Sequence, residues 1–259
     1  MDAGRGASSM QRMRRPDLIA HLDRLLEPGR FRDYGPNGLQ VEGEDEIRCL
    51  ATAATASLAA CQAAVAAGAQ ALLVHHGLFW GGETRVVGPL AGRLRVLLGG
   101  GVSLIAYHLP LDAHPEVGNN AVALRRLGCA DVGVFGDKDL GRKGRLAEPL
   151  PIAAVIARCA DAFIHPVLHC PGGPAVVQTV GVVTGGGQGW LTSASAAGCD
   201  VFITGEASEQ SWHEAAELGC HLLACGHHAT ENHAVHELGA GLAARFGLRH
   251  VAIQGDNPI

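Results

Sequence analysis

The sequence is poor in aromatic residues and carries little net charge, and both shortages exclude classes of protein. Phe, Trp and Tyr make up 4% of the 259 residues, so the chain lacks the stacking surfaces of single-strand nucleic-acid binders. Its 20 basic and 25 acidic residues give a formal net charge of −5, whereas general nucleic-acid binders show a basic excess. We therefore expect no nucleic-acid partner.

Membrane, targeting and cross-linking signals are also missing. No stretch contains the roughly 18 consecutive apolar residues that a membrane-spanning helix needs, so we expect no membrane contact. The arginines near the N-terminus are not followed by an apolar run, so we interpret residues 1–14 as a disordered leader and not as a secretory signal. The eight cysteines are scattered without a CxxC pair, which is typical of reduced core thiols in a cytoplasmic protein.

Apolar residues are plentiful, at 47%, and they occur in short segments that alternate between strand-like and helix-like patterns. This alternation predicts an α/β fold with parallel βαβ units. Residues 31–43 are expected to form a loop leading to an edge strand, and residues 131–150 a hairpin or a linker. The predicted strands lie within 48–56, 71–77, 101–112, 178–187, 200–206 and 220–231, and the predicted helices within 16–30, 57–69, 89–99, 119–128, 188–198 and 207–218.

The two halves of the chain repeat the same order of elements. Residues 71–112 and residues 200–231 each read as a strand, a helix and a second strand that runs into a histidine-containing turn. An internal duplication would explain the match, but regular strand–helix alternation would produce it as well.

Histidine is unusually frequent, with 14 residues, and the polar residues cluster where apolar strands stop. Ligand sites of open parallel sheets lie beyond the carboxyl ends of the strands. These residues are distant in the sequence, yet the fold is expected to bring them together. They are His75, His76, His108, Asp112, Glu206, His227 and Glu231.

Two of these clusters have the composition of a metal site. His75 and His76 end a strand where the chain turns, so both imidazoles can reach one cavity, although one of them could equally be a core or capping histidine. Asp112 follows His108 by four residues, and a carboxylate beside an imidazole is common in zinc and other transition-metal sites. The alternative is that Asp112 caps a helix that begins near Val117.

The third cluster is GHHATE, residues 226–231, where His227 and Glu231 would share one face of a helix. The alternative is a surface loop. Taken together, three imidazoles and two carboxylates suit two divalent cations with a bridging carboxylate and open positions for water. The candidate ligands are His75, His76, Asp112, His227 and Glu231.

Two further features follow strands. The Gly-rich segment 184–190 is either a simple tight turn or a backbone cradle for a phosphate or carboxylate. Glu206 could serve as a general base.

At this point the motifs resemble a known family. They are YGPNGLQVEG (34–43), LLVHHGLFWGG (72–82), YHLPLDAHPEVGNNA (107–121), VVTGGGQ (182–188) and DVFITGEASEQ (200–210) followed by GHHATE. In this order they resemble the bacterial GTP cyclohydrolase 1 type 2 homologs, relatives of an NGG-one-interacting factor. The resemblance covers residues 15–259, and the length is similar to that of the short form without an additional middle domain. It implies two interleaved α/β domains, residues 1–130 plus 226–259 and residues 131–225, with a metal site in the cleft between them.

The resemblance also implies a toroidal homohexamer, a trimer of dimers, with a dinuclear metal site facing its inner cavity. The family's ligands fall on the five candidates named above, and Glu231 would bridge the two divalent cations. The other four ligands would divide into the pairs His76 with Asp112 and His75 with His227. Zinc, iron, manganese and nickel all accept such a ligand set.

The family name suggests that a metal-bound hydroxide attacks a nucleotide ring or a cyclic amide of a small-molecule substrate, while Glu206 or His108 shuttles protons. The alternative is a non-catalytic protein for metal handling, metal delivery or regulatory binding, because fold does not fix activity. No lysine lies near these motifs, so Arg85 and Arg93 are the candidates to hold a phosphate.

Overall fold

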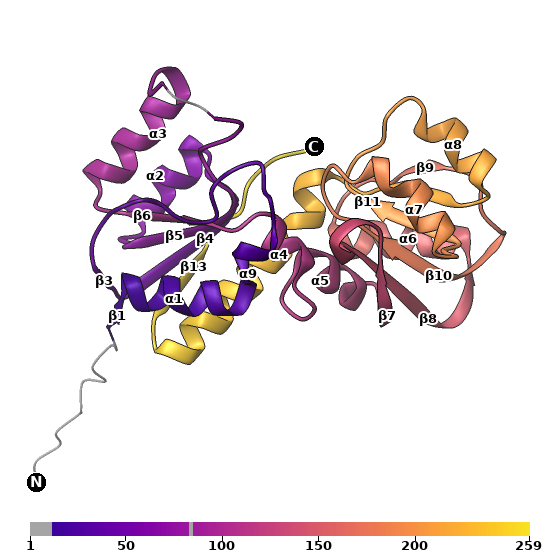
Figure 1. Ribbon diagram of the computed structural model, residues 1–259, viewed down its shortest axis with the longest axis horizontal. Helices are drawn as coiled ribbons and strands as arrows, with labels where there is room; N and C mark the ends of the chain where they lie inside the picture. Colours follow the sequence, from indigo (N-terminus) through magenta and orange to yellow (C-terminus); the bar gives the residue numbers. More distant parts are fainter. Residues whose placement is uncertain (1–11, 83–84) are drawn as a thin grey trace, which may run out of the picture.

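The computed structural model describes residues 12–82 and 85–259, which form two three-layer halves side by side (Figure 1). Each half has a β-sheet between helices, so the predicted α/β class is confirmed. Most of the predicted leader, residues 1–11, lies outside the described residues. The prediction is wrong for Met13 and Arg14, which form the short strand β1 (Met13–Arg14) and pair with β3 (Glu46–Ile47).

The first half is built on a five-stranded sheet. Its consecutive strands β4, β5 and β6 are parallel, as the alternation predicted. The edge strand β2 is antiparallel to β6, so the sheet is mixed and not wholly parallel. In sheet order the strands are β13 (Arg249–Ala252), β4 (Cys49–Thr55), β5 (Ala71–His76), β6 (Ser103–Ala106) and β2 (Gly38–Val41).

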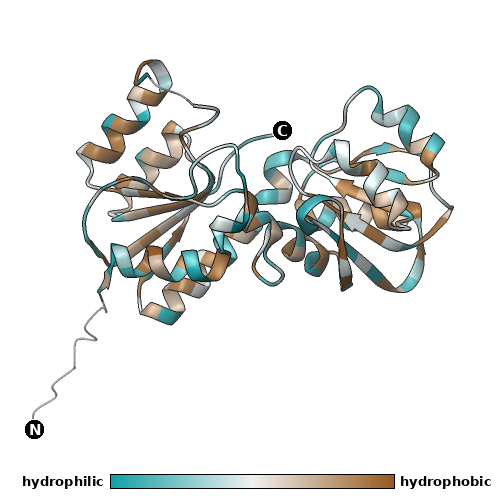
Figure 2. Cartoon of the chain, in the orientation of Figure 1, coloured by the Kyte–Doolittle hydropathy of each residue, from teal (hydrophilic) through white to brown (hydrophobic). Residues whose placement is uncertain are grey.

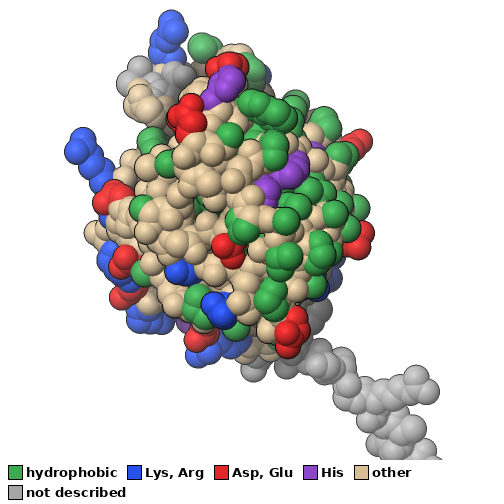
Figure 3. All heavy atoms as spheres, turned by 90° about the vertical axis from the view of Figure 1, so that its right-hand side faces the viewer, with side chains coloured by type: hydrophobic (Ala, Val, Ile, Leu, Met, Phe, Trp, Pro, Cys, Tyr) green, Lys and Arg blue, Asp and Glu red, His purple; other side chains and the backbone are tan. Residues whose placement is uncertain are grey.

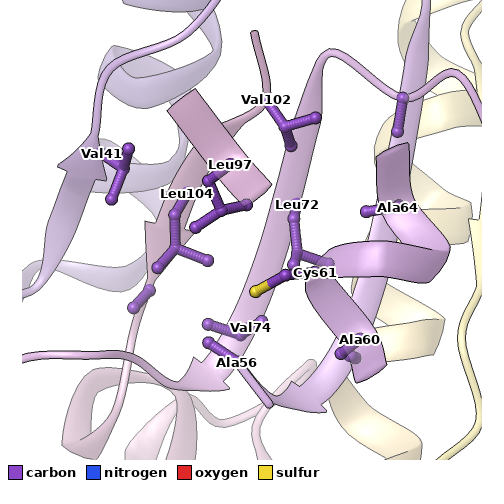
Figure 4. Packing of buried hydrophobic residues seen from close by; sticks show 14 of the residues in the cluster. Val41, Ala56, Ala60, Cys61, Ala64, Leu72, Val74, Leu97, Val102 and Leu104 are labelled. Atoms are coloured by element: carbon purple, nitrogen blue, oxygen red, sulfur yellow. The ribbon is translucent and has the colours of Figure 1, made fainter. Parts of the chain in front are cut away.

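Helices cover both faces of this sheet. On one face lie α2 (Leu58–Ala66) and α3 (Gly88–Gly99), and on the other lie α1 (Arg15–Leu26) and α9 (His227–Phe246). Figure 4 shows the first interface, where Cys61 of α2 meets Leu72 of β5.

The predicted helix over residues 16–30 ends earlier, at Leu26. Glu27 adopts a left-handed conformation with φ 49°, and the 3-10 turn η1 (Pro28–Arg30) follows it.

The second half is built on a six-stranded mixed sheet. Its strands β7 and β8 are antiparallel neighbours, which confirms the hairpin alternative for residues 131–150. The strands β10, β11 and β12 are parallel. In sheet order the strands are β7 (Cys129–Phe135), β8 (Gly141–Pro151), β10 (Val176–Val182), β11 (Val201–Thr204), β12 (His221–Ala224) and β9 (Leu168–Cys170).

Helices also cover both faces of the second sheet. On one face lie α5 (Asn119–Arg126) and α6 (Ile152–Phe163), and on the other lie α7 (Leu191–Ala196) and α8 (Ser211–Leu218). The remaining short elements of the described chain are the helix α4 (Leu109–Ala113) and the 3-10 turns η2 (Asp137–Asp139) and η3 (Gln188–Trp190).

The repeated order seen in the sequence has a structural counterpart. β5, α3 and β6 form a parallel strand pair joined by a helix, and so do β11, α8 and β12. The matching topology leaves the duplication an interpretation, because independent βαβ units look the same.

Hydrophobic residues concentrate in the strands and on the inner faces of the helices (Figure 2). The long helix α9 leaves the end of β12 in the second half and runs beneath the five-stranded sheet to β13, so it connects the two halves. Within the described chain, no helix combines the length and the apolar character needed to cross a bilayer.

Candidate metal centre

The carboxyl ends of β5 and β6 supply the first side chains of the site. His75 and His76 are the last two residues of β5, and His76 lies beside Thr55 of β4 in the parallel register. Beyond β6 the chain enters α4, which carries Asp112. The strand predicted within residues 101–112 ends at Ala106, and Pro110 lies in the first turn of α4, where a helix tolerates proline.

The N-terminus of α9 supplies the remaining two candidates. His227 is the first residue of the helix, so Glu231 follows one turn later on the same face. The distance from His227 Nε2 to Glu231 Oε2 is 3.1 Å. The surface-loop alternative for GHHATE is therefore wrong, since Glu231 has only 3% of its surface exposed.

All five predicted ligand residues meet at one place. His75 Nε2 lies 3.6 Å from Asp112 Oδ1 and 3.5 Å from Glu231 Oε1, and His76 Nε2 lies 3.2 Å from Glu231 Oε2. Their ligand atoms form the groups His75, Asp112, Glu231 and His76, His227, Glu231, each close enough to hold a metal ion.

Glu231 is common to both groups, as a bridging carboxylate would be. The distances favour a division of the other four residues that differs from the one implied by the family resemblance, because they place His75 with Asp112 and His76 with His227. His108 joins His75 and His76 in a third group, with ring centroids 5.0 and 5.6 Å from theirs.

The four imidazoles share one arrangement, in which Nδ1 is hydrogen-bonded outside the cluster. For the three whose partner is a carbonyl or carboxylate, this bond places the hydrogen on Nδ1 and leaves Nε2 to coordinate a cation. The bonds join His75 to the Tyr107 carbonyl (3.1 Å), His76 to Thr55 Oγ1 (3.1 Å), His108 to Asp33 Oδ1 (2.7 Å) and His227 to Glu206 Oε1 (2.6 Å).

Glu206 therefore contacts the far side of His227. It does not line the cavity at the centre but a separate surface groove of about 700 Å³, next to His165 and Ile259. His108, the other residue predicted to shuttle protons, does line the cavity.

The two buried carboxylates create a strong demand for positive charge. Burial opposes protonation of His75, but the charges of Asp112 and Glu231 outweigh it and raise its pKa to about 9. The adjacent Glu231 carboxylate raises the pKa of His227 to about 9 as well, against the effect of burial. Burial and the neighbouring His75 charge lower the pKa of His76 to about 3.

Glu231 provides the direct test of whether a cation fits. Burial disfavours its charge, yet the surrounding imidazoles hold its pKa well below the usual range. Its Oε2 is fully buried and has no hydrogen-bond partner among the described residues, although two Nε2 atoms lie 3.1 and 3.2 Å away. A carboxylate oxygen that faces the Nε2 atoms of two imidazoles suits a divalent cation.

The Gly-rich turn leaves room for the side chains of Glu231 and His227, because it carries no side chain at Gly185. Gly185 has φ +64°, and a Cβ there would lie 1.9 Å from Glu231 Oε1 and 3.0 Å from His227 Nε2. Only glycine combines that backbone conformation with so close an approach. The turn thus borders the candidate metal centre directly.

A cavity of about 410 Å³ opens from this centre. Asp112, His227 and Glu231 lie at its base, and Tyr34 and Trp190 are among its walls. Among the residues that the structure describes, the Lys and Arg side chains that line it are Arg32 and Lys138. The expectation that Arg85 and Arg93 are its cations is wrong, because neither lines it.

A family model for DUF34/NIF3, NGG1p interacting factor 3, matches residues 13–258. The chain belongs to the DUF34/NIF3 family.

Individual relatives agree with this assignment. A protein of Allochromatium vinosum named GTP cyclohydrolase 1 type 2 homolog is 47% identical over 244 residues, covering 93% of this chain and 96% of the relative. The solved structure of a protein named ybgI, described as of unknown function, is 41% identical with a TM-score of 0.91 and covers 95% and 100% of the two chains. TTHA1606 of Thermus thermophilus is 39% identical with a TM-score of 0.88, over the same shares.

In this DUF34/NIF3 chain, sequence reasoning missed two residues that hold side chains of the site. Asp33 binds His108, and Asn119 Nδ2 donates to Asp112 Oδ1 at 2.7 Å. Asn119 begins α5 and belongs to the same motif as Asp112, residues 107–121, so its place in that motif was the available signal. Asp33 had no comparable signal, because only the fold brings its loop to His108.

Proposed function

We propose that the protein is a metal-dependent hydrolase that uses two divalent cations to open a ring of a small-molecule substrate. One observation carries this proposal: the imidazoles of His75 and His227 have Nδ1 committed to a fixed acceptor and Nε2 within 3.5 Å of the buried Glu231 carboxylate. Such fixed tautomers are the pattern of preorganised metal sites.

The residues divide into two candidate sets. His75, Asp112 and Glu231 would hold one cation, and His76, His227 and Glu231 the other. Divalent cations held there would supply Lewis-acid activation of water and of a polar substrate group. Asn119 fixes Asp112, and Glu206 orients His227, so the chain keeps both sets in place.

His108 is the residue best placed to move a proton. It lines the cavity, and Asp33 holds its Nδ1, so its Nε2 would exchange a proton with the substrate. The name of the curated relatives points to a nucleotide ring as the substrate group, and a cyclic amide presents similar chemistry.

Elemental analysis of the purified protein tests the metal sites. We expect two metal ions per chain in the wild type, about one in Asp112→Ala and none or one in Glu231→Ala, because Glu231 belongs to both sets. Asp137→Ala is the matched control, since this exposed carboxylate lines the same cavity but belongs to neither set. Unchanged metal content in both ligand variants would refute the assignment.

Turnover of a panel of nucleotides and cyclic amides tests the hydrolase. We expect His108→Gln to retain both metal ions and to lose about 10²–10⁴-fold in rate, the usual contribution of a general acid or base. A wild type with two metal ions that turns over no compound of the panel contradicts the hydrolase.

One observation favours a second function, a non-catalytic role in metal handling or delivery. Glu206 lies outside the cavity, so the centre has one acid–base group fewer than the sequence predicted. This function predicts weakly held metal that passes to an apo-acceptor protein, whereas the hydrolase predicts metal retained through many turnovers.

A further inference from the structure

Two cationic side chains that line the cavity at the candidate metal centre have no ion-pair partner among the described residues. Arg32 and Lys138 both line it and are exposed. Within residues 12–82 and 85–259, neither side chain makes a hydrogen bond or an ion pair with another residue. Acidic residues stand on both sides of Lys138 in the sequence: Asp137, which also lines the cavity, and Asp139, which does not.

The backbone around Lys138 is held in an unusual conformation. Lys138 and Asp139 have φ of 52° and 57°, which non-glycine residues adopt at a cost of roughly 1 kcal/mol or more each. Gly136, with φ +76°, lets the end of the hairpin lie on the Trp190 indole, because a Cβ there would be 2.1 Å from the ring. The hairpin thus presents Lys138 to the cavity next to an aromatic wall.

The loop that carries Arg32 is equally well fixed. Its neighbour Asp33 accepts hydrogen bonds from His108 and Asn37, and the Tyr34 carbonyl accepts one from the Gly81 N–H at 3.1 Å. The loop therefore holds Arg32 and Tyr34 at the cavity without using the Arg32 guanidinium.

The Gly-rich segment 184–190 does not form the backbone cradle for an anion that was one of its two predicted roles. Three of its backbone N–H groups already donate to side chains within the fold, so they are not free to hold a phosphate. The donor and acceptor pairs are Thr184 with Asn120, Gly185 with Thr230 and Gly187 with Thr204.

We propose that Arg32 and Lys138 bind the anionic group, a phosphate or a carboxylate, of a ligand whose planar ring lies against Tyr34 and Trp190. A guanidinium and an ammonium are the donors that such groups prefer. The volume of about 410 Å³ lies within the range of small-molecule sites, which is ~300–1,000 Å³. The part of this inference that places the reacting end of the ligand at the metal centre rests on the proposed hydrolase function.

The test is a calorimetric binding measurement with two pairs of probes. Guanosine monophosphate and guanosine differ by a phosphate, and orotate and uracil differ by a carboxylate. We expect at least one anionic probe to bind the wild type more tightly than its uncharged partner. The double variant R32Q/K138Q should weaken that probe by about tenfold or more and leave the uncharged partner unchanged.

Arg95→Gln is the matched control, because Arg95 is exposed on α3 and lines none of the described cavities. The affinity of the anionic probe should also fall with added salt in the wild type, and less so in the double variant. Preference for the phosphate pair or for the carboxylate pair identifies the anionic group.

The metal content of the same samples separates this inference from the proposed function. A double variant that keeps its metal and still binds the anionic probe as tightly as the wild type overturns the inference and leaves the hydrolase standing. Equal binding of charged and uncharged probes by the wild type also overturns it. A protein without metal that still loses affinity in the double variant supports the inference and contradicts the hydrolase.

Discussion

A single carboxylate, Asp33, organises the loop beside the candidate metal centre. Its two oxygens accept hydrogen bonds from the backbone N–H groups of Tyr34 and Leu109 and from the side chains of Asn37 and His108. The side chain has only 3% of its surface exposed, which alone would favour the neutral acid. The hydrogen bonds outweigh this burial and lower the pKa of Asp33 to about 2.

The shift predicts a pH-dependent loss of stability in Asp33→Asn. Because the folded pKa of about 2 lies below the usual 3.8, the carboxylate stabilises the fold fully above pH ~4, by about 2 kcal/mol, and this contribution disappears as the pH falls toward 2. Urea unfolding at pH 7 should show the full difference from the wild type, and unfolding at pH 3 a smaller one. A difference that does not change between these pH values would show that the charge is not responsible.

Substitutions of Glu206 distinguish two roles of this side chain. Holding the His227 ring needs only a hydrogen-bond acceptor, whereas proton transfer needs a carboxylate. Glutamine can still accept the His227 Nδ1–H, so Glu206→Gln should retain metal and most activity, whereas Glu206→Ala should lower metal affinity by about 10–100-fold. Metal titration with a competing chelator and turnover measure both. A Glu206→Gln variant with full metal content and no turnover would restore the role of general base.

At this scale, the site residues at the ends of strands could be predicted from the sequence, whereas those carried by loops could not. His75, His76 and His227 stand directly after apolar segments, so the strand pattern alone placed each of them at the end of a strand, β5 in the first sheet and β12 in the second. Arg32 and Lys138 come from loops whose paths depend on tertiary packing, and no local pattern marks them.

Among the helices and strands, α9 is the longest element that the sequence analysis missed. Only its first turn, with His227 and Glu231, was predicted to be helical. Its buried residues include Leu238 and Leu242 but also the polar Thr230 and Glu231 and the small Gly239. The resulting hydrophobic contrast between its faces is weak, so periodicity gives little signal. By contrast, β4, β5 and β6 were recognisable because they are short, apolar and bounded by turn residues.

In the turn that follows β10, adding a methyl group at Gly185 should be much more disruptive than adding one at the next residue, Gly186. Gly185→Ala would force a Cβ against Glu231 in a left-handed backbone, so we expect a loss of about 1–3 kcal/mol in unfolding free energy and a loss of bound metal. Gly186→Ala is the control, because the nearest atom to its Cβ would be 3.8 Å away and its φ is not left-handed. Equal metal content in both variants would contradict this role of Gly185.

At the scale of the whole molecule, the division into two domains and the hexameric assembly stay proposals. The strands of the two sheets come from separate stretches of chain, apart from β13, which returns to the first sheet through α9. The end formed by the six-stranded sheet displays hydrophobic side chains on its surface (Figure 3). In this half the large hydrophobic residues exposed by half or more are Val132, Ile164, Leu168, Val176 and Trp212.

We expect these exposed side chains to be covered by further copies of the chain. Light scattering should then give about six times the chain mass of 26.8 kDa. Added salt should leave a mainly apolar contact intact. A mass equal to one chain at micromolar concentration would refute the hexamer.

The path of α9 has a consequence for synthesis on the ribosome. His75, His76 and Asp112 emerge in the first half of the nascent chain, whereas His227 and Glu231 emerge only after the whole second sheet has been translated. A growing polypeptide therefore lacks the carboxylate common to both ligand groups until translation is nearly finished, so loading with cations would be a late event in the maturation of the protein.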